Sequence, residues 1–171
     1  MTKAKNDRNF DSIAGKFQQN IYATSKGKLR EKVLQRDLAE LPQLQQTACQ
    51  ILDVGAGQGQ VHLTDVSAEM LAMARNSAAE RGLLPHTTFS HAPMQHLVQQ
   101  GVQYPIVLCH AVLEWMADAK QAIADLWALT APGGTLSLMF YNIDAKRFSN
   151  IVYGNFNYVL RDLTYKKKVH L

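Results

Sequence analysis

The stretch that most constrains this chain is an apolar segment that runs directly into three alternating glycines, ILDVGAGQGQ at residues 51–60. Glycine has no Cβ, so such a loop reaches backbone conformations that other residues avoid and lets a ligand contact the backbone itself. Asp53 stands at the carboxyl end of the predicted strand, where it faces such a ligand. The same glycine pattern also occurs in plain tight turns, so the loop alone leaves both interpretations open.

A second predicted strand, Val61 to Thr64, is followed by the acidic residue Asp65. In a doubly wound sheet, an acid at this place accepts hydrogen bonds from the hydroxyls of a ribose. That acid usually comes about 20 residues after the glycines, beyond a crossover helix, and here it is much closer. Two parallel strands need a crossover of about a dozen or more residues. We therefore expect that a segment is absent after Gln60 and that consecutive numbering hides a gap before Val61.

Length and composition indicate a globular protein. The chain has 171 residues, of which 47% are apolar, enough for one domain with a real core. A net charge of +4 permits a polyanionic partner without requiring one. Cys49 and Cys109 lack metal-ligand spacing, which favours reduced thiols over a disulfide. No apolar run approaches the ~20 residues that span a bilayer, and the polar start has no signal-peptide core. We expect a cytoplasmic protein without a membrane partner.

Apolar periodicity predicts alternating helices and strands along the chain. After the first strand, we expect strands at 61–64, 87–91, 106–109 and 135–141, helices at 11–21, 29–41, 68–81, 94–100 and 118–129, a polar connection at 22–27 and a turn at 131–134. Strands that are apolar on both faces imply a parallel sheet covered by helices. The sequence predicts a single α/β domain with a doubly wound, mostly parallel sheet, in which residues 1–45 form a helical lid and residues 48–171 an incomplete core.

Polar residues follow several of these strands at the edge where open α/β sheets bind ligands. His110 comes after the fourth strand, and it is either a structural hydrogen-bond donor or a contact to a cofactor, with a general base the less favoured role. Arg30, early in the second helix, is either a solvated cation or the partner of a ligand carboxylate. Tyr141 and Asn142 end the fifth predicted strand and offer a hydroxyl and an amide.

The end of the chain is basic, with three consecutive lysines at 166–168. Such a run is more often a solvated tail than a binding site. Together with Arg147, Arg161 and nearby aromatic residues, it is also the composition that contacts phosphates and a splayed base. We find no Ser-His-Asp order, no Cys-x-x-Cys pair, no zinc-helix motif and no phosphate-loop lysine, so hydrolysis and metal catalysis have no support.

These motifs resemble those of class I S-adenosylmethionine-dependent methyltransferases. The resemblance rests on the glycine loop with Asp53, the acid Asp65 and the turn Pro132-Gly133-Gly134. The chain is more specifically similar to the bacterial tRNA 5-carboxymethoxyuridine methyltransferases, in segments that include NDRNFD at 6–11, NIY at 20–22, KGKLR at 26–30, HAVLEW at 110–115, LSLMFYN at 136–142 and GNF at 154–156. The similarity runs over nearly the whole chain.

This resemblance implies methyl transfer from S-adenosylmethionine to the carboxylate of 5-carboxymethoxyuridine at the wobble position of tRNA. It implies that Arg30 holds the methionine carboxylate, that Asp65 holds the ribose hydroxyls and that His110 closes the pocket. The other cofactor contacts that it implies are Asp53, Gly55, Ala56 and Gly57 around the glycine loop and Met94 and Gln95 beside the adenine. Contacts to the tRNA are expected from Tyr141, Asn142, Lys166 and Lys167.

The chain departs from the family's pattern at three places. The segment expected after Gln60 is absent, Pro105 stands where the family has an acidic residue, and the chain ends before the final helix and antiparallel strands of such folds. Two other functions therefore stay open. One is methyl transfer to a small carboxylic acid or a lipid, and the other is a non-catalytic module that binds the cofactor.

Overall fold

The computed structural model describes residues 24–45, 49–54 and 60–163. The chain divides into two compact units, Met1–Met139 and Phe140–Leu171. The helix expected at 11–21 and five expected site residues, Gly55, Ala56, Gly57, Lys166 and Lys167, lie outside the described residues. The expectation that residues 1–45 form a lid on a single domain stays a prediction.

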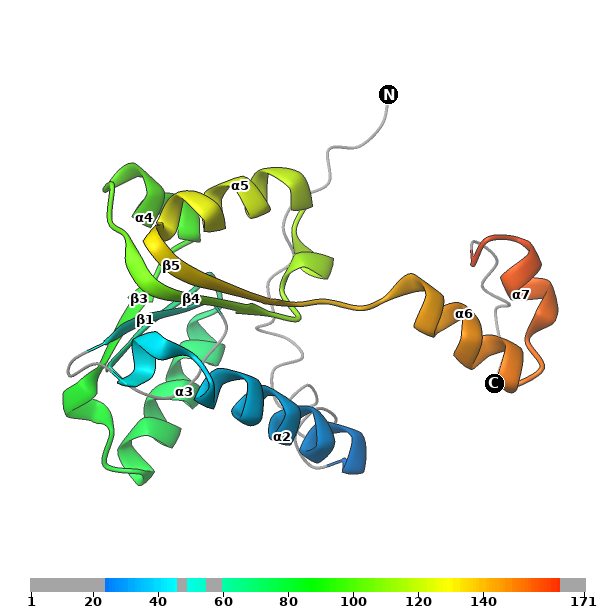
Figure 1. The fold of residues 1–171 in the computed structure, drawn as a ribbon, viewed down its shortest axis with the longest axis horizontal. Helices are drawn as coiled ribbons and strands as arrows, with labels where there is room; N and C mark the ends of the chain where they lie inside the picture. Colours follow the sequence, from blue (N-terminus) through cyan, green and yellow to red (C-terminus); the bar gives the residue numbers. More distant parts are fainter. Residues whose placement is uncertain (1–23, 46–48, 55–59, 164–171) are drawn as a thin grey trace. The chain divides into compact units, whose positions relative to one another are not determined.

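A five-stranded parallel sheet forms the centre of the first unit, in the order β3-β2-β1-β4-β5 (Figure 1). Its strands are β1 (Gln50–Val54), β2 (Gln60–Asp65), β3 (Thr87–His91), β4 (Tyr104–His110) and β5 (Thr130–Met139). The strand order reverses at β1, which has β2 on one side and β4 on the other. This arrangement confirms the predicted doubly wound α/β fold, and it brings the carboxyl ends of β1, β2 and β4 to one edge of the sheet.

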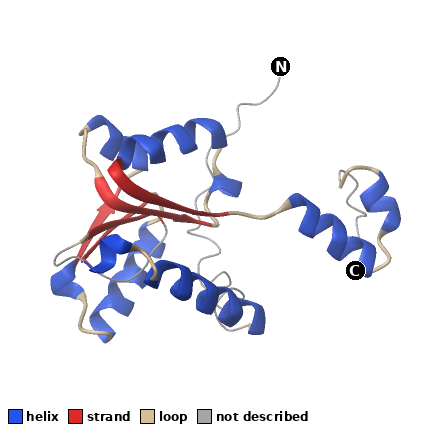
Figure 2. Cartoon of the chain, viewed as in Figure 1, coloured by secondary structure: helices blue, strands red, loops and turns tan. Residues whose placement is uncertain are grey.

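Helices cover both faces of this sheet (Figure 2). The elements are α2 (Ser25–Ala39), α3 (Ala68–Glu80), α4 (Met94–Gln99) and α5 (Ala119–Leu129), with the short turns η1 (Pro42–Gln45), η2 (Leu84–His86) and η3 (Leu113–Trp115). On one face, Leu52 packs in a buried cluster with Leu97 of α4 and Leu126 of α5. On the other face, Ile51 belongs to a cluster against which α2 and α3 pack. Adjacent residues of β1 thus serve opposite faces, as expected for a strand buried on both sides.

Capping side chains fix where the helices begin. Thr24 is the N-cap of α2, and its Oγ1 accepts a hydrogen bond from the backbone N–H of Gly27 at 3.0 Å. The predicted start at residue 29 was therefore too late, and the last residues of the polar connection expected at 22–27 are helical. Ser67 caps α3 as predicted, because its Oγ accepts from Met70 N at 3.1 Å. Asp118 caps α5 in the same way.

The connection between β1 and β2 is short. Gln60 and Val61 pair with Gln50 and Ile51 as successive residues of β2, so these two residues are neighbours in the strand. The expectation that a segment of the family's fold is absent after Gln60 stays a prediction. Only residues 55–59 separate the two strands. A helical crossover needs about a dozen residues or more, and the two strands are neighbours here with fewer residues between them.

The ladder between β4 and β5 contains a register shift. Tyr104 pairs with Thr130, whereas Ile106 already pairs with Thr135. Pro105 lies between them and has no N–H to donate to the ladder. A Cβ on Gly134 would lie 2.9 Å from the carbonyl oxygen of Pro105, so glycine is required at this close approach.

This shift corrects the boundaries that we predicted for the last strand. The turn expected at 131–134 lies within the span of β5, which begins at Thr130 rather than at residue 135. The strand also ends at Met139, before Tyr141.

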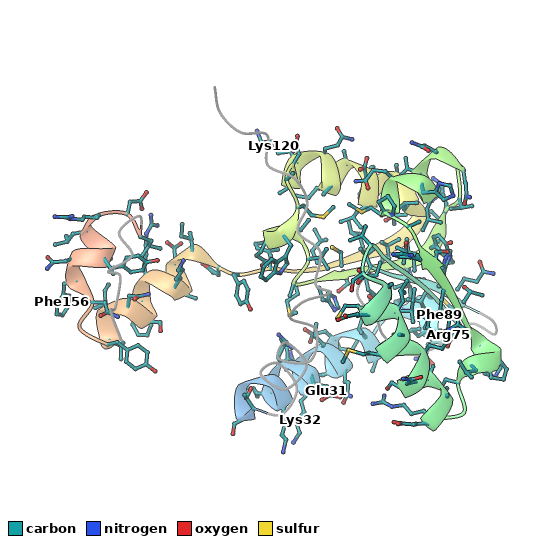
Figure 3. The ribbon with its side chains drawn as sticks, turned by 180° about the vertical axis from the view of Figure 1, so that it is seen from behind. Glu31, Lys32, Arg75, Phe89, Lys120 and Phe156 are labelled. Atoms are coloured by element: carbon teal, nitrogen blue, oxygen red, sulfur yellow. The ribbon has the colours of Figure 1, made fainter. Side chains whose placement is uncertain are left out.

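One contact between α3 and β3 is visible in Figure 3, where Arg75 and Phe89 lie against each other. The guanidinium carbon of Arg75 is 4.5 Å from the centre of the Phe89 ring, within the range of a cation–π interaction. Phe89 in turn packs on the cluster that contains Ile51, between the sheet and α2 and α3. The contact holds α3 against the outer strand of the sheet.

The second unit contains α6 (Ile143–Val152) and α7 (Phe156–Leu160). Asn142 is the N-cap of α6, because its side-chain oxygen accepts from the backbone N–H of Asp144 at 2.8 Å. The sequence prediction had placed Asn142 at the end of a strand, and its role as a helix cap corrects this. Arg147 joins the ends of the unit through ion pairs to Asp144 at 2.9 Å and Asp162 at 2.6 Å.

Candidate active site

Three polar side chains lie at the edge of the sheet that the carboxyl ends of β1, β2 and β4 form. Residues two apart in a strand point to the same face of the sheet. Asp53, Asp65 and His110 each stand two residues after a member of the cluster under α2 and α3, namely after Ile51, Leu63 and Leu108. The three side chains therefore share one edge and one face of the sheet. This is the arrangement that the sequence predicted for a ligand site.

Asp53 is the most buried carboxyl group at this edge, with 3% of its surface exposed. Burial raises its pKa from 3.8 to about 8, because a charged carboxylate loses its hydration in the protein interior. In the protein without ligand, Asp53 is thus largely protonated at neutral pH. A positively charged ligand group placed beside it would favour the ionised form.

Asp65 ends β2 and leads into α3. Its Oδ1 accepts a hydrogen bond from the backbone N–H of Ser67 at 2.7 Å, which fixes the orientation of the carboxylate. The side chain is half-buried, so it has access to solvent on one side. A carboxylate held in this way is suited to accept hydrogen bonds from paired hydroxyls.

His110 ends β4, contacts β5 and lies within the electrostatic reach of α2. Its Nε2 lies 2.9 Å from Oγ of Ser137 on β5. Burial, followed by the positive charge of Arg30 on α2, lowers the pKa of His110. Arg30 is itself half-buried, and both roles that the sequence left open for it stay predictions. The structure thus brings Arg30 to the same edge as His110.

Ser137 was missed in the sequence analysis. The signal was present, because Ser137 is a polar residue between Leu136 and Leu138, and both of these pack on the opposite face of the sheet. Alternation along the strand would have placed Ser137 on the ligand face. Only the pairing of β4 with β5 shows that it meets His110.

The thiol of Cys109, near this edge, is unreactive. Burial, followed by the charges of Asp53 and Glu114, raises the pKa of the Cys109 thiol to about 12. A thiol with such a pKa is protonated at neutral pH and is not a nucleophile. Across residues 24–45, 49–54 and 60–163, no group of three His, Cys, Asp or Glu side chains could hold a metal ion.

Met94 and Gln95 belong to the other face of the sheet. Met94 is buried in the cluster with α5, with 3% of its surface exposed. The side-chain amide of Gln95 donates to Asp125 Oδ2 of α5 at 2.9 Å. Their expected contact with an adenine stays a prediction. Tyr141 and Asn142 lie in the second unit, and their expected contact with a substrate also stays a prediction.

A hollow of about 250 Å³ lies at the opposite edge, where the strands begin. Its lining residues include His62 of β2 and Tyr104 of β4. Nδ1 of His62 lies 2.6 Å from the Tyr104 hydroxyl, and Nε2 lies 2.6 Å from Ser90 Oγ. Both ring nitrogens are thus occupied within the protein, and this hollow is separate from the candidate site.

The chain matches a family model described as a methyltransferase domain, over residues 36–136. This protein belongs to that methyltransferase family. The match includes β1 to β4 and all three polar residues of the candidate site on those strands. No helix among the described residues of this methyltransferase is long and apolar enough to cross a membrane.

Two curated relatives are informative. The tRNA 5-carboxymethoxyuridine methyltransferase of Escherichia coli K12 is 41% identical over 176 residues, which cover 95% of this chain and 67% of the relative. Since 176 exceeds the 171 residues of this chain, the relative has residues without a counterpart here. The trans-aconitate 2-methyltransferase of Variovorax paradoxus is 31% identical over 122 residues, which cover 64% of this chain and 44% of that protein.

Solved structures agree on the fold. A protein of Methanococcus maripaludis, provisionally described as an S-adenosyl-L-methionine-dependent methyltransferase, has a TM-score of 0.60 and 14% identity, covering 98% of this chain and 90% of that one. The magnesium protoporphyrin IX methyltransferase of Synechocystis, solved with bound S-adenosylmethionine, has a TM-score of 0.52 and 20% identity, covering 71% and 68%. These two structures support the fold alone. The match to the methyltransferase domain supports S-adenosylmethionine, the cofactor expected from the sequence.

The donor set at the edge fits this cofactor. S-adenosylmethionine carries a carboxylate, an ammonium group and two ribose hydroxyls. Arg30 would supply a cation for the carboxylate, and Asp65 would supply an oriented acceptor for the hydroxyls. Asp53 would supply an anion for the ammonium group, whose positive charge would favour its ionised form. Each of these three side chains would thus match one part of the cofactor.

Proposed function

We propose that this protein transfers a methyl group from S-adenosylmethionine to the carboxylate of 5-carboxymethoxyuridine at the wobble position of tRNA, giving the methyl ester. The observation that carries the proposal is the 41% identity, over 95% of this chain, to the E. coli methyltransferase named for that nucleoside. The chain spans 67% of that relative's length.

In this proposal, each residue of the site has one role. Arg30 pairs with the cofactor carboxylate, Asp53 with its ammonium group and Asp65 with its ribose. His110, neutral because its pKa is lowered, closes the site without adding a positive charge. The expected glycine-loop contacts of Gly55, Ala56 and Gly57, and those of Met94 and Gln95, belong to the same proposal.

The reaction suits a site that has few chemical groups. When bound, S-adenosylmethionine supplies an electrophilic methyl group on a sulfonium, and its loss leaves a neutral thioether. A carboxylate is already ionised at neutral pH, so the protein needs no general base to activate it. The protein's contribution is to hold the two partners in line and to exclude water, which together can supply most of the acceleration.

The tRNA side is proposed to include the second unit. Tyr141, Asn142, Lys166 and Lys167 are the contacts expected there. Exposed aromatic side chains of this unit, among them Phe156 (Figure 3), and the positive charges beside them are typical of surfaces that stack bases and pair with phosphates. A tRNA substrate would also place the enzyme in the cytoplasm.

A second candidate is methyl transfer to a small carboxylic acid. The similarity to the trans-aconitate 2-methyltransferase of V. paradoxus favours it. Both curated relatives are named for a substrate that carries a carboxylate. The chemistry of the cofactor side is the same in the two candidates, so only the acceptor distinguishes them.

Mass spectrometry of wobble nucleosides tests the proposal. The purified protein is incubated with S-adenosylmethionine and tRNA that carries 5-carboxymethoxyuridine, and the nucleoside is expected to gain the mass of one CH₂ group. Matched tRNA without this modification should gain nothing, and the Asp65→Ala variant should be slower. Methylation of trans-aconitate or a related acid, with no gain on tRNA, would establish the second candidate instead.

Salt dependence provides an independent measurement. Affinity for tRNA should fall steeply as salt rises, because phosphate contacts release counterions. Affinity for a small acid should change far less.

A further inference from the structure

His110 and Ser137 form a hydrogen bond across the two strands at the site. Their side chains are on adjacent strands, and the atoms Nε2 and Oγ are 2.9 Å apart. His110 pairs with Met139 and Leu108 with Ser137, so Ser137 is displaced by two residues from the position opposite His110. Both side chains lie on the face that carries Asp53. The bond is therefore made at the ligand edge and not within the core.

The backbone after His110 is strained, and a hydrogen bond to β5 holds it in that conformation. Ala111 has a φ of +59°, a left-handed conformation that alanine rarely adopts. Its N–H donates to the carbonyl oxygen of Met139 at 2.7 Å, which holds the turn against β5. Strain of this kind persists only where the surrounding structure imposes it, and it gathers at functional sites. Main chain and side chain of this segment are thus both tied to β5.

The orientation of the His110 ring decides which nitrogen faces the ligand edge. A neutral imidazole has one nitrogen that donates and one that accepts, and a serine hydroxyl can serve as the partner of either. The bond to Ser137 occupies Nε2, which restricts the orientation of the ring and thereby the side to which Nδ1 turns. Without the hydroxyl, rotation about the side-chain bonds of His110 would be less restricted.

We propose that Ser137 is a positioning residue for cofactor binding. Its hydroxyl holds the imidazole of His110 in the orientation in which that ring contacts the bound cofactor. This inference rests on the assignment of His110 to the cofactor side in the proposed function. It does not depend on which molecule accepts the methyl group. Ser137 itself is not assigned a contact with cofactor or substrate.

Isothermal calorimetry with S-adenosylmethionine alone, without tRNA, tests the proposal. Loss of one hydrogen bond predicts that Ser137→Ala binds the cofactor roughly 2- to 10-fold more weakly. Ser137→Thr keeps the hydroxyl and should bind nearly as the unchanged protein does. Thr135→Ala is the matched control, because Thr135 lies on the same strand and its Oγ1 accepts from Gln43 at 3.1 Å, away from His110. That variant should keep its affinity.

A double-mutant cycle separates positioning from a merely structural role. In a His110→Phe background, Ser137→Ala should cause no further loss of affinity, because the two residues act as one unit. If Ser137→Ala does not fold, the pair Ser137→Thr and Ser137→Val gives the same comparison at nearly equal volume, and only the threonine variant should retain affinity.

Three results would overturn the inference. They are unchanged affinity in Ser137→Ala, equal affinity in the threonine and valine variants, and a loss that persists in full when His110 is already replaced. Because the readout is cofactor binding, failure of the tRNA assay would leave this test unaffected. Failure of this test would equally leave the acceptor assay intact.

Discussion

Arg30 on α2 and His110 at the end of β4 are far apart in sequence, yet the positive charge of Arg30 reaches the His110 imidazole and, after burial, is the second cause of its lowered pKa. The pair links the first described helix to the centre of the sheet. It also makes the position of Arg30 measurable, because a change at residue 30 should appear in the titration of residue 110.

For Arg30→Ala, we expect weaker binding of S-adenosylmethionine by about 1.5–3 kcal/mol, the usual contribution of a hydrogen bond to a charged group. The pKa of His110 should rise, which NMR titration of the imidazole would record. Lys32→Ala is the control, since it removes a neighbouring exposed cation from the same helix (Figure 3). Normal cofactor affinity combined with weaker tRNA binding would move Arg30 to the substrate side.

For Asp65→Ala, we expect cofactor binding to weaken by about 1–3 kcal/mol, because the ribose hydroxyls lose their acceptor. Ser67→Ala serves as the control for the start of α3. It removes the N-cap, at a cost of about 1 kcal/mol in stability, and leaves the carboxylate in place. Calorimetry on both variants decides the assignment, and an unchanged affinity in Asp65→Ala would remove this residue from the site.

The buried Asp53 should make the stability of the ligand-free protein depend on pH. Its pKa is 3.8 in the unfolded chain and about 8 in the folded protein. Between these values the folded state binds the proton more tightly, so the free energy of unfolding from this group is greatest below pH 3.8 and falls as the pH rises towards about 8.

Urea unfolding at a series of pH values across that interval measures this slope. Asp53→Asn has no titrating group at the position and should show a flatter dependence. An identical slope in both proteins would show that Asp53 does not titrate as burial predicts.

At the opposite edge of the sheet, Tyr104→Phe should lower the free energy of unfolding by about 1 kcal/mol, because the 2.6 Å contact with His62 is lost. Tyr153→Phe is the control, since Tyr153 is 78% exposed and its hydroxyl should contribute little. Cofactor affinity should stay constant in both variants. A loss of cofactor binding in Tyr104→Phe would contradict the separation of the hollow from the active site.

Local signals in the sequence were sufficient for most elements and for the polar residues at the ends of the strands. Apolar runs marked the strands, Ser67 marked the start of α3, and Asp53, Asp65 and His110 followed from their places after strands. These features depend on residues close in sequence. The segment expected to be absent after Gln60 stays a prediction, because it concerns residues that this sequence does not contain.

Features that depend on strand pairing were beyond this reasoning. The register shift between Tyr104 and Ile106 arises only when β4 meets β5. The bond between Ser137 and His110 has the same origin. Asn142 was a different case, because its local signal as a helix cap existed and was interpreted as the end of a strand.

The left-handed Ala111 has a consequence for attempts to make this protein more heat-resistant. Glycine adopts this backbone conformation without a steric penalty, so Ala111→Gly should raise stability by about 1 kcal/mol. The same exchange would loosen the turn that follows His110. Position 111 is therefore one at which selection for thermostability and selection for cofactor binding would favour different residues.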